Sequence, residues 1–407
     1  MGKQRRWRVG WALALSVTLF AAACGDDDGG GSTGFKFGMI LVGAQNDHGW
    51  SQAHYEAGLY VVQELHLPAD AMIVLDKVNP ADRPQTSIES VVDDMVARGA
   101  RLIFATSDDM KDGIEAAAAA HPKVPMIWSS GDSAWAEGKA YRADLTNLGN
   151  IMGRMEYGKM IAGCAAALTT QAGKIAYLGP LINDETRRLV NSAYLGARYC
   201  FASYRGRDPG ALRFEVKWIG FWFNIPGVTL DPTQVTNELF AAGADVVISG
   251  LDTREALVRT GELAAAGDAV WATPYDFVGA CASAPEVCLG VPYFNWGPAY
   301  LDTARSVIAG QFKAQWLWLG PDWDNINDRD RSAVGWLSGD GLAADAKAHL
   351  DDFIDGLGNG NIQLYVGPLE WQDGTPFLTP GERATDFQIW YAEQLLEGII
   401  GASAADG

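Results

Sequence analysis

The sequence predicts an α/β protein with two similar Rossmann-like lobes, because two long stretches of the chain repeat each other. Asp94–Asp108 aligns with Glu238–Asp252: in each stretch a helix end runs through Gly-Ala into a short apolar strand, and an aspartate follows the strand. A fainter echo relates Lys36–Leu41 to Lys174–Leu178. A doubled strand-helix-strand unit implies two lobes that are built alike.

The repeated aspartates also predict where a ligand binds. In open α/β sheets, ligands bind beyond the carboxyl ends of the strands. Asp108 and Asp252 each follow such a strand. We therefore expect the two carboxylates to face one another across a cleft between the lobes.

Strands and helices alternate along the first part of the chain. We expect strands at 35–41, 73–78, 101–106 and 125–128, and helices at 50–65, 85–98 and 114–121. Between Gln85 and Arg98 the apolar residues lie on one face of the helix, which is typical of a helix that covers a sheet. The apolar strand at 101–106 is typical of a parallel strand that is covered on both sides.

The second part of the chain follows the same scheme, beginning with a long helix at 149–168. We expect strands at 174–178, 214–221, 246–250, 271–275, 287–293, 316–319, 333–337 and 362–366. The expected helices lie at 184–201, 232–242, 254–266, 298–311, 345–357 and 384–398. We assign residues 35–145 and 277–330 to lobe 1, and residues 146–276 and 331–407 to lobe 2.

The first 34 residues are predicted to be a leader and a tether. Basic residues precede an uncharged apolar run from Val9 to Ala23, which predicts a secretory signal peptide at 1–23, too short for a membrane-spanning helix. Cys24 directly follows small residues, which predicts the lipid-modified first residue of a bacterial lipoprotein; an ordinary signal with a chance cysteine is the alternative. Residues 24–34 are rich in Gly and Asp and predict a flexible tether.

The chain is acidic, with 50 Asp and Glu against 31 Lys and Arg and a formal net charge of −19. Four basic residues lie in the predicted signal peptide, so the mature chain would keep 27 and carry a net charge of −23. Such a surface repels phosphate backbones, and we expect no nucleic-acid partner. Attachment to a membrane would then depend on the lipid.

Four cysteines remain besides Cys24. An exported protein can form disulfides. Cys164 and Cys200 each lie late in a predicted helix, whereas Cys281 and Cys288 bracket a short loop. Three pairings are open, and four buried free thiols are the alternative.

Motifs of enzymes and of metal sites are absent from the sequence. It contains no Walker loop, no Gly-x-Ser-x-Gly nucleophile elbow and no His-Glu-x-x-His. The five histidines lack the spacing of metal ligands, apart from a loose pair, His48 and His54. We therefore expect a protein that binds a ligand and has no catalytic residue, no metal and no cofactor.

Tryptophan is abundant, with 15 residues. Trp50, Trp128, Trp222 and Trp296 lie at the ends of predicted strands or helices. A clamp that binds a flat ligand needs aromatic faces to stack on and a few carboxylates or amides for the edge of the ligand. Core packing is the alternative for each of these tryptophans.

Several strings of residues resemble the basic membrane protein (BMP) lipoproteins, the purine-nucleoside-binding components of ABC importers. The most specific are Asn46–Gly58 and Asn295–Tyr300. Others follow in the family's order: Ile103–Ser107, Gly173–Tyr177, Leu195–Arg198, Gly243–Val247, Tyr275-Asp276 and Gly367–Leu369. The resemblance covers nearly all of residues 35–401, and it implies a type I periplasmic binding-protein fold with two lobes, a multi-strand hinge and no catalysis.

The resemblance also implies which residues contact the ligand. In lobe 1 they are Asn46, Asp47, Trp50, Thr106 and Ser107. In lobe 2 they are Trp222, Asp252 and Asp276. In the family an acid near Asp276 binds the purine edge, where a carboxylate accepts hydrogen bonds from N–H groups, and aromatic side chains stack on the ring.

Two departures from the family concern the ligand. Asp108 and Asp109 stand where an aromatic-glycine pair usually follows the Thr-Ser, which adds Asp108 to the expected site. Many nucleoside binders have a lysine after the next strand that holds the ribose hydroxyls, but Leu289–Gly297 has none, and Trp296 is the conspicuous residue there. The missing lysine favours a free base, whereas two aspartates could hold a ribose by themselves, so base and nucleoside both stay open.

We therefore expect an exported, monomeric lipoprotein that is anchored by lipid to the outer face of a membrane, in the periplasm or at the cell surface. Its partners would be a purine nucleobase or nucleoside and the permease and ATPase of an ABC importer. Two alternatives stay open. One is a ligand-sensing periplasmic module for a sugar or another small molecule, and the other is an exported nucleoside or glycoside hydrolase that uses paired acids such as Asp252 and Asp276.

Overall fold

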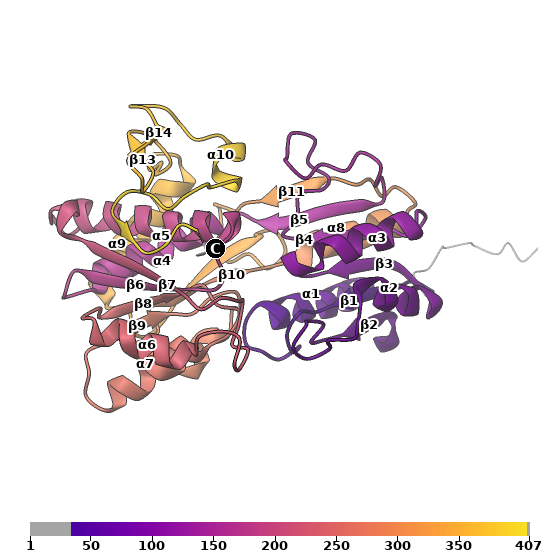
Figure 1. Cartoon of the computed structure of the whole chain (residues 1–407), viewed down its shortest axis with the longest axis horizontal. Helices are drawn as coiled ribbons and strands as arrows, with labels where there is room; N and C mark the ends of the chain where they lie inside the picture. Colours follow the sequence, from indigo (N-terminus) through magenta and orange to yellow (C-terminus); the bar gives the residue numbers. More distant parts are fainter. Residues whose placement is uncertain (1–33, 405–407) are drawn as a thin grey trace, which may run out of the picture. The chain divides into compact units, whose positions relative to one another are not determined.

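The computed structural model describes residues 34–404, so the predicted signal peptide and Cys24 lie outside the described residues. Two sheets dominate this part of the chain, and every strand pairing within them is parallel (Figure 1). We call the part around the six-stranded sheet lobe 1 and the part around the five-stranded sheet lobe 2. The structure thus has the doubled α/β organisation that the repeat predicts.

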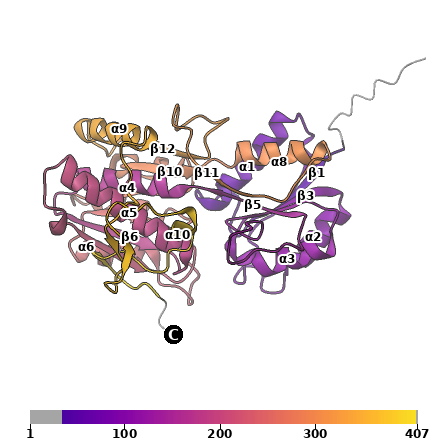
Figure 2. The ribbon, with the colours of Figure 1, turned by 90° about the horizontal axis from the view of Figure 1, so that it is seen from above.

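The sheet of lobe 1 is covered by helices on both faces. In spatial order its strands are β11 (Trp316–Leu319), β5 (Leu148–Gly153), β4 (Met126–Ser129), β3 (Ala100–Ala105), β1 (Lys36–Ile40) and β2 (Met72–Leu75). Helices α1 (Trp50–Glu64) and α8 (Gly297–Ile308) pack together on one face, and α2 (Ile88–Ala97) and α3 (Lys111–Ala120) on the other (Figure 2). This double cover explains why β3 is buried apart from Arg101.

The sheet of lobe 2 repeats this arrangement with different helices. Its strands are β15 (Ile399–Ile400), β7 (Arg213–Trp218), β6 (Lys174–Gly179), β8 (Val246–Ser249) and β9 (Trp271–Thr273). Helix α4 (Met155–Thr169) packs against α5 (Asp184–Ser203) and α9 (Ala344–Gly358), and α6 (Pro232–Ala241) packs against α7 (Glu255–Ala265). A small antiparallel pair, β13 (Leu369–Glu370) and β14 (Pro376–Leu378), lies near the C-terminus. Short 3-10 helices lie at Ala69–Ala71, Asp108–Met110, Pro209–Ala211, Ala280–Ser283 and Pro285–Val287.

Three passages of the chain connect the lobes. They run from β5 into α4, from β10 (Gly290–Phe294) into α8, and from β11 into β12 (Val334–Ser338). Strands β10 and β12 pair in antiparallel fashion. Phe294 and Val334 belong to the hydrophobic core of lobe 1, whereas Leu289 and Trp336 belong to that of lobe 2. The pair therefore reaches from one core into the other, as expected of a multi-strand hinge.

The long helix predicted at 149–168 is wrong in its first part. Leu148–Gly153 forms β5, which lies between β4 and β11, and α4 begins only at Met155. All residues of β5 are buried. A short apolar run that is buried on every side has no period that separates a strand from a helix. The sheet of lobe 1 therefore reaches Gly153, beyond the boundary that we expected at 145.

The C-terminal part is less regular than predicted. The helix expected at 384–398 is reduced to α10 (Asp386–Trp390), and the residues expected as a strand at 362–366 form one isolated bridge, at Val366. After α10, backbone groups bond to distant partners; for example, the Leu396 N–H donates to the Asn191 side chain at 2.9 Å. These long-range contacts replace helical hydrogen bonds, and a local pattern does not reveal them.

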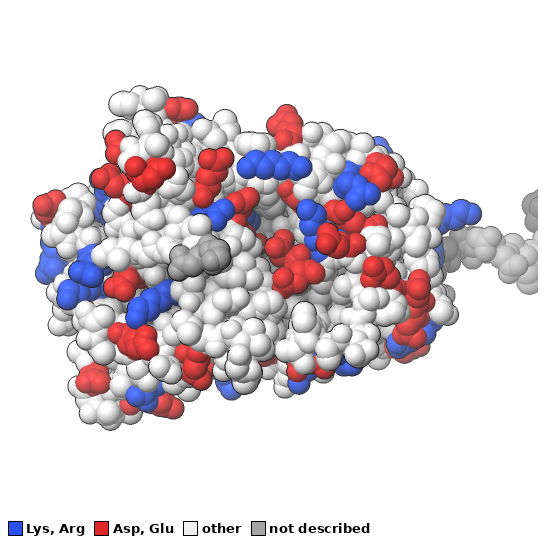
Figure 3. All heavy atoms as spheres, in the orientation of Figure 1, with Lys and Arg blue, Asp and Glu red and all other residues white. Residues whose placement is uncertain are grey.

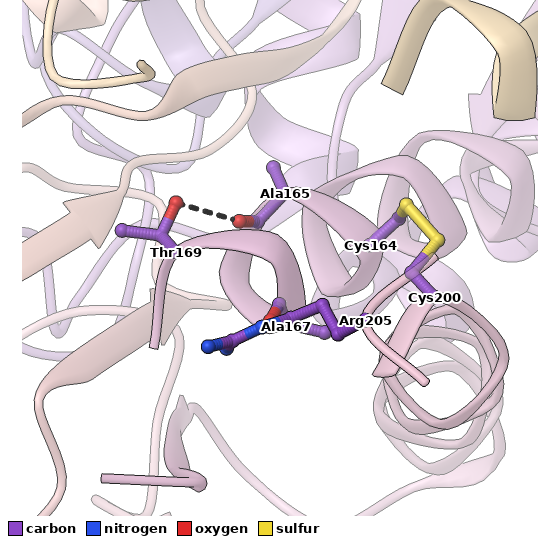
Figure 4. The surroundings of a disulfide bond; sticks show 6 residues. All are labelled: Cys164, Ala165, Ala167, Thr169, Cys200 and Arg205. Carbon is purple, nitrogen blue, oxygen red and sulfur yellow. Dashed lines mark hydrogen bonds between the residues drawn. A yellow bond between two sulfur atoms is a disulfide. The ribbon is translucent and has the colours of Figure 1, made fainter. Parts of the chain in front are cut away.

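Residues 34–404 contain two disulfides, and they form one of the three pairings that the sequence left open. Cys164–Cys200 connects α4 to α5 (Figure 4). Cys281–Cys288 closes the loop before β10. Close to the first disulfide, Arg205 donates to the carbonyl oxygen of a residue in α4 at 2.9 Å (Figure 4). The end of α4 and the end of α5 are thus held together covalently and by this hydrogen bond.

The described surface carries both charges. On the face drawn in Figure 3, Asp and Glu are interspersed with Lys and Arg. Among residues 34–404, no helix combines the length and the apolar character that crossing a membrane requires.

Replacing both Cys164 and Cys200 with alanine should lower the free energy of unfolding by about 2–4 kcal/mol, because the disulfide constrains the unfolded chain. These cysteines are 36 residues apart, whereas Cys281 and Cys288 are 7 apart. A shorter loop loses less entropy on closure, so the matched Cys281/Cys288 double variant should lose less. Denaturant unfolding measures both losses, and an equal or larger loss for the short loop would contradict this ranking.

Candidate ligand-binding site

A cavity lies where the carboxyl ends of the two sheets meet. Lobe 1 contributes Trp50, Ser107, Asp108 and Ser130 to its wall. Lobe 2 contributes Tyr177, Pro180, Glu185, Thr186, Leu189, Trp222, Gly250, Asp252 and Tyr275. Residues of both lobes thus enclose one cavity, at the position where open α/β sheets bind their ligands.

Many of the lining residues come directly after a strand. Ser107 and Asp108 follow β3, Pro180 follows β6, Gly250 follows β8, and Tyr275 lies two residues beyond β9. Parallel strands end at the same edge of a sheet, so the residues after them gather there. The cavity is therefore a direct consequence of the two parallel sheets.

The two lobes touch at the edge of this cavity. The Trp50 N–H donates to the carbonyl oxygen of Asp252 at 3.3 Å. Gly49 approaches so closely that a Cβ atom there would lie 1.7 Å from the same oxygen. The Trp222 Nε1–H donates to a carboxylate oxygen of Asp109 at 3.0 Å. Two lobe-to-lobe hydrogen bonds thus involve tryptophans that line the cavity.

The ring of Trp50 is fixed by its surroundings. Its Nε1–H donates to the carbonyl oxygen of Thr106 at 2.5 Å. Phe294 and Trp296 meet it edge-on, with ring centroids 5.3 Å away in both cases, and His54 does so at 4.7 Å. A ring held on several sides in this way presents a rigid surface to a flat ligand.

Carboxylates give the cavity its electrostatic character. Burial raises the pKa of Asp108 to about 6 and the pKa of Glu185 to about 7. Burial also raises the pKa of Asp252 well above its ordinary value, and neighbouring carboxylates add to this effect. The cation near them, Arg188, is bound by Glu156 at 2.6 Å. Desolvated carboxylates are stabilised by protons or by a ligand that donates hydrogen bonds.

Half of the residues expected at the site line this cavity. They are Trp50, Ser107, Asp108, Trp222 and Asp252. Asp108 and Asp252 come from different lobes and share one cavity wall, which is the arrangement that the internal repeat suggests.

The other expected residues have different surroundings. Asn46 is exposed. Asp47 accepts hydrogen bonds at 2.9–3.0 Å from three backbone N–H groups at the start of α1. The Thr106 hydroxyl donates to a carbonyl oxygen of β1 at 2.8 Å, and Trp296 packs behind the lining tryptophan of α1. Asp276 is fully buried next to the cavity wall.

Several lining residues escaped the sequence reasoning. Tyr275 belongs to a string that supports the family resemblance, so its position could have been used. Glu185 lies in the first turn of α5, where acidic residues are common because of the helix dipole. Gly49 lies beside the cavity, and its lack of a side chain lets the backbone of the other lobe come close. No local pattern marks a role of that kind.

Comparison with known protein families gives a match over residues 35–245 to ABC transporter substrate-binding proteins of the PnrA-like type, the BMP family. The chain belongs to this family. Its members bind the substrate of an ABC transporter, so the chain has a small-molecule ligand and works with a permease and an ATPase. Substrate-binding proteins of ABC importers are exported to the periplasm or the cell surface.

Two relatives cover most of the BMP chain. A purine-binding protein of Brucella abortus (strain 2308) is 25% identical over 351 residues, which are 86% of this chain and 89% of the relative. A protein of Haloferax volcanii named as an ABC transporter glucose-binding protein is 28% identical over 302 residues, which are 72% and 67% of the two chains.

Two solved structures of ABC solute-binding proteins show the same fold. The protein from Aeropyrum pernix K1 matches with a TM-score of 0.62 at 14% identity, covering 80% of this chain and 92% of that one. The protein from Conexibacter woesei matches with a TM-score of 0.57 at 19% identity, covering 81% and 98%. The chain therefore has the type I periplasmic binding-protein fold that its sequence predicts.

Gly49→Ala should keep the lobes from closing, because the new Cβ would meet the Asp252 carbonyl oxygen of the other lobe. We expect ligand affinity to fall roughly tenfold or more. Small-angle scattering with the ligands considered below should show a larger radius of gyration than for the wild type.

Gly34→Ala is the matched control, because a Cβ there would meet no atom within 4 Å and the residue lies away from the passages between the lobes. It should bind and close like the wild type. Normal closure of the Gly49→Ala variant would show that the contact with Asp252 does not limit the motion.

Proposed function

We propose that this chain captures a purine nucleobase or nucleoside in the cavity between its lobes and delivers it to the permease of an ABC importer. The observation that carries the proposal is the combination of aromatic rings and carboxylates in one cavity. The rings are those of Trp50, Tyr177, Trp222 and Tyr275, and the carboxylates are those of Asp108, Glu185 and Asp252. Membership of the BMP family and the purine-binding relative support the same ligand class.

The chemistry of a purine matches this combination. Its flat ring system offers two faces for aromatic contact, and its edge carries N–H donors. A hydrogen bond from such a donor to a charged acceptor contributes roughly 1.5–3 kcal/mol. The hydroxyl groups of a ribose can donate to the same carboxylates. Base and nucleoside are therefore both included in the proposal.

Binding and closure would be coupled through shared residues. Trp50 and Trp222 line the cavity and also bond to the opposite lobe. A ligand held between these two rings contacts both lobes only when they are closed, so it binds the closed form more tightly than the open form. The permease would then recognise the closed, loaded form.

Calorimetric titration of the refolded protein with adenine, guanine, adenosine, inosine, ribose and glucose tests the ligand class. We expect at least one purine to bind and ribose and glucose to remain silent, because neither sugar offers an aromatic face to the rings of the cavity. Binding of a sugar without any purine would contradict the proposal. Release of free base from adenosine would also contradict it, since a binding protein returns its ligand unchanged.

Asp252→Asn should weaken purine binding by roughly tenfold, because one of the two carboxyl oxygens that can accept a hydrogen bond from the ligand becomes an amide nitrogen, which only donates. Asp302→Asn is the matched control, because this carboxylate lies on α8 with a side chain that is 80% exposed. Equal affinities of the two variants would remove Asp252 from the site.

We also propose that Cys24 carries the lipid that anchors the protein. Cys24→Ser should move the protein from the membrane fraction to the soluble fraction of its native host, because the lipid is attached to the thiol. Fractionation followed by immunodetection measures the distribution. A Cys24→Ser variant that stays in the membrane fraction would contradict the anchor.

A further inference from the structure

Lys159 is a buried lysine directly behind the cavity wall. It projects from α4 and is 0% exposed. Its ammonium donates to the carbonyl oxygen of Ser249 at 2.6 Å and lies 3.4 Å from the ring centroid of Tyr275 and 5.3 Å from that of Tyr177. Both tyrosines line the cavity, as does Gly250, which follows Ser249. Lys159 therefore supports three parts of the wall from behind.

The position of this lysine demands a partner of opposite charge. Lysine is almost never fully buried unless it is paired, because an ammonium group loses its hydration on burial. The rings of Tyr177 and Tyr275 attract the ammonium, but this attraction replaces only part of the lost hydration. The carboxylate that acts on Lys159 is that of Asp276, which opposes the lowering of the lysine pKa by burial.

Asp276 is as unusual as Lys159. Its φ is 70°, in the left-handed region that few residues other than glycine adopt. Strand β10 holds the backbone of Asp276 on both sides. The Asp276 N–H donates to the carbonyl oxygen of Pro292 at 3.2 Å, and the Asp276 carbonyl oxygen accepts from the Phe294 N–H at 3.0 Å. Neither of its carboxyl oxygens has a hydrogen-bond partner among residues 34–404. A buried carboxylate in this state needs a compensating charge.

The groups around Asp276 are mostly acidic. They are the carboxyl groups of Asp47, Glu185 and Asp252 and the phenols of Tyr177 and Tyr275. Burial raises the pKa of Asp276, the nearby carboxylates add to the rise, and Lys159 opposes it. Lys159 is thus the cation that balances this part of the cavity wall.

We propose that Lys159 is a positioning residue for the wall of the ligand cavity. Its ammonium holds Tyr275 and the Ser249–Gly250 turn in that wall and balances the carboxylate of Asp276 behind it. The inference rests on the proposed function, since it names a residue that shapes the proposed purine site.

A double-mutant cycle tests the pairing. Lys159→Met removes the positive charge at similar volume, Asp276→Asn removes the negative charge at similar shape, and the double variant removes both. Each single variant should bind adenosine roughly tenfold more weakly, and the double variant about threefold more tightly than Lys159→Met. The proposal would be overturned if Lys159→Met bound adenosine as tightly as the wild type does. It would also be overturned if the double variant bound adenosine no more tightly than Lys159→Met.

The pH profile separates a charge role from a merely structural one. Burial lowers the pKa of Lys159 to about 7, so the ammonium is lost as the pH rises through neutrality. Wild-type affinity for adenosine should therefore fall between about pH 6 and about pH 8.5, and this fall should be absent in Lys159→Met. Asp47, Glu185 and Asp252 titrate in both proteins, so the difference reports on Lys159 together with Asp276, whose titration depends on it. Identical profiles would overturn the proposal.

A measurement without ligand keeps the pairing separate from the ligand class. If no purine binds, the proposed function fails, but the unfolding midpoints of the same variants still test the pair. The double variant should unfold at a higher temperature than either single variant, since each single variant leaves an uncompensated buried charge. A double variant that loses the sum of the two single losses would overturn the pairing.

Discussion

The peptide groups around Asp252 join the two lobes, and much of the cavity depends on them. The Asp252 carbonyl oxygen accepts from Trp50 in lobe 1, and the Asp252 N–H donates to the carbonyl oxygen of Trp222 at 3.1 Å. Both tryptophans line the cavity, so the backbone of one residue holds the backbone at a lining tryptophan of each lobe. The approach is close enough that only glycine fits at position 49. A closed cavity therefore requires a residue without a side chain at this point.

Closure also concentrates negative charge, and this constrains the ligand. Asp108 comes from lobe 1, whereas Glu185 and Asp252 come from lobe 2. Bringing them together out of water is unfavourable unless protons, cations or hydrogen-bond donors accompany them. Arg188 supplies part of this compensation for Asp108 and Glu185, and Lys159 acts in the same way on the neighbouring Asp276. A donor-rich ligand supplies more of it in the closed form than in the open one, which gives it the differential affinity that a hinge motion needs.

The sequence predicts those features that local order determines. Parallel strands end at one edge, so residues placed just after a strand, such as Asp108 and Asp252, could be assigned to the cleft. The strand at 148–153 could not, because its burial between two neighbours leaves no period to detect. Gly49 and Lys159 could not be assigned either. Their roles depend on distances to residues far away in the sequence, and these distances exist only in the folded chain.

The abundance of tryptophan suggests many aromatic faces for a ligand, but several of these rings pack against one another away from the cavity. Among the described residues, Trp50 and Trp222 are the tryptophans that line the cavity. A second group packs near the hinge: Trp135 stacks on Trp316 with ring centroids 4.0 Å apart, and Trp390 meets Trp316 edge-on at 5.1 Å. Since Trp390 belongs to the C-terminal segment of α10, these rings join that segment to lobe 1. Tryptophan content therefore reports packing around the hinge as well as lining of the cavity.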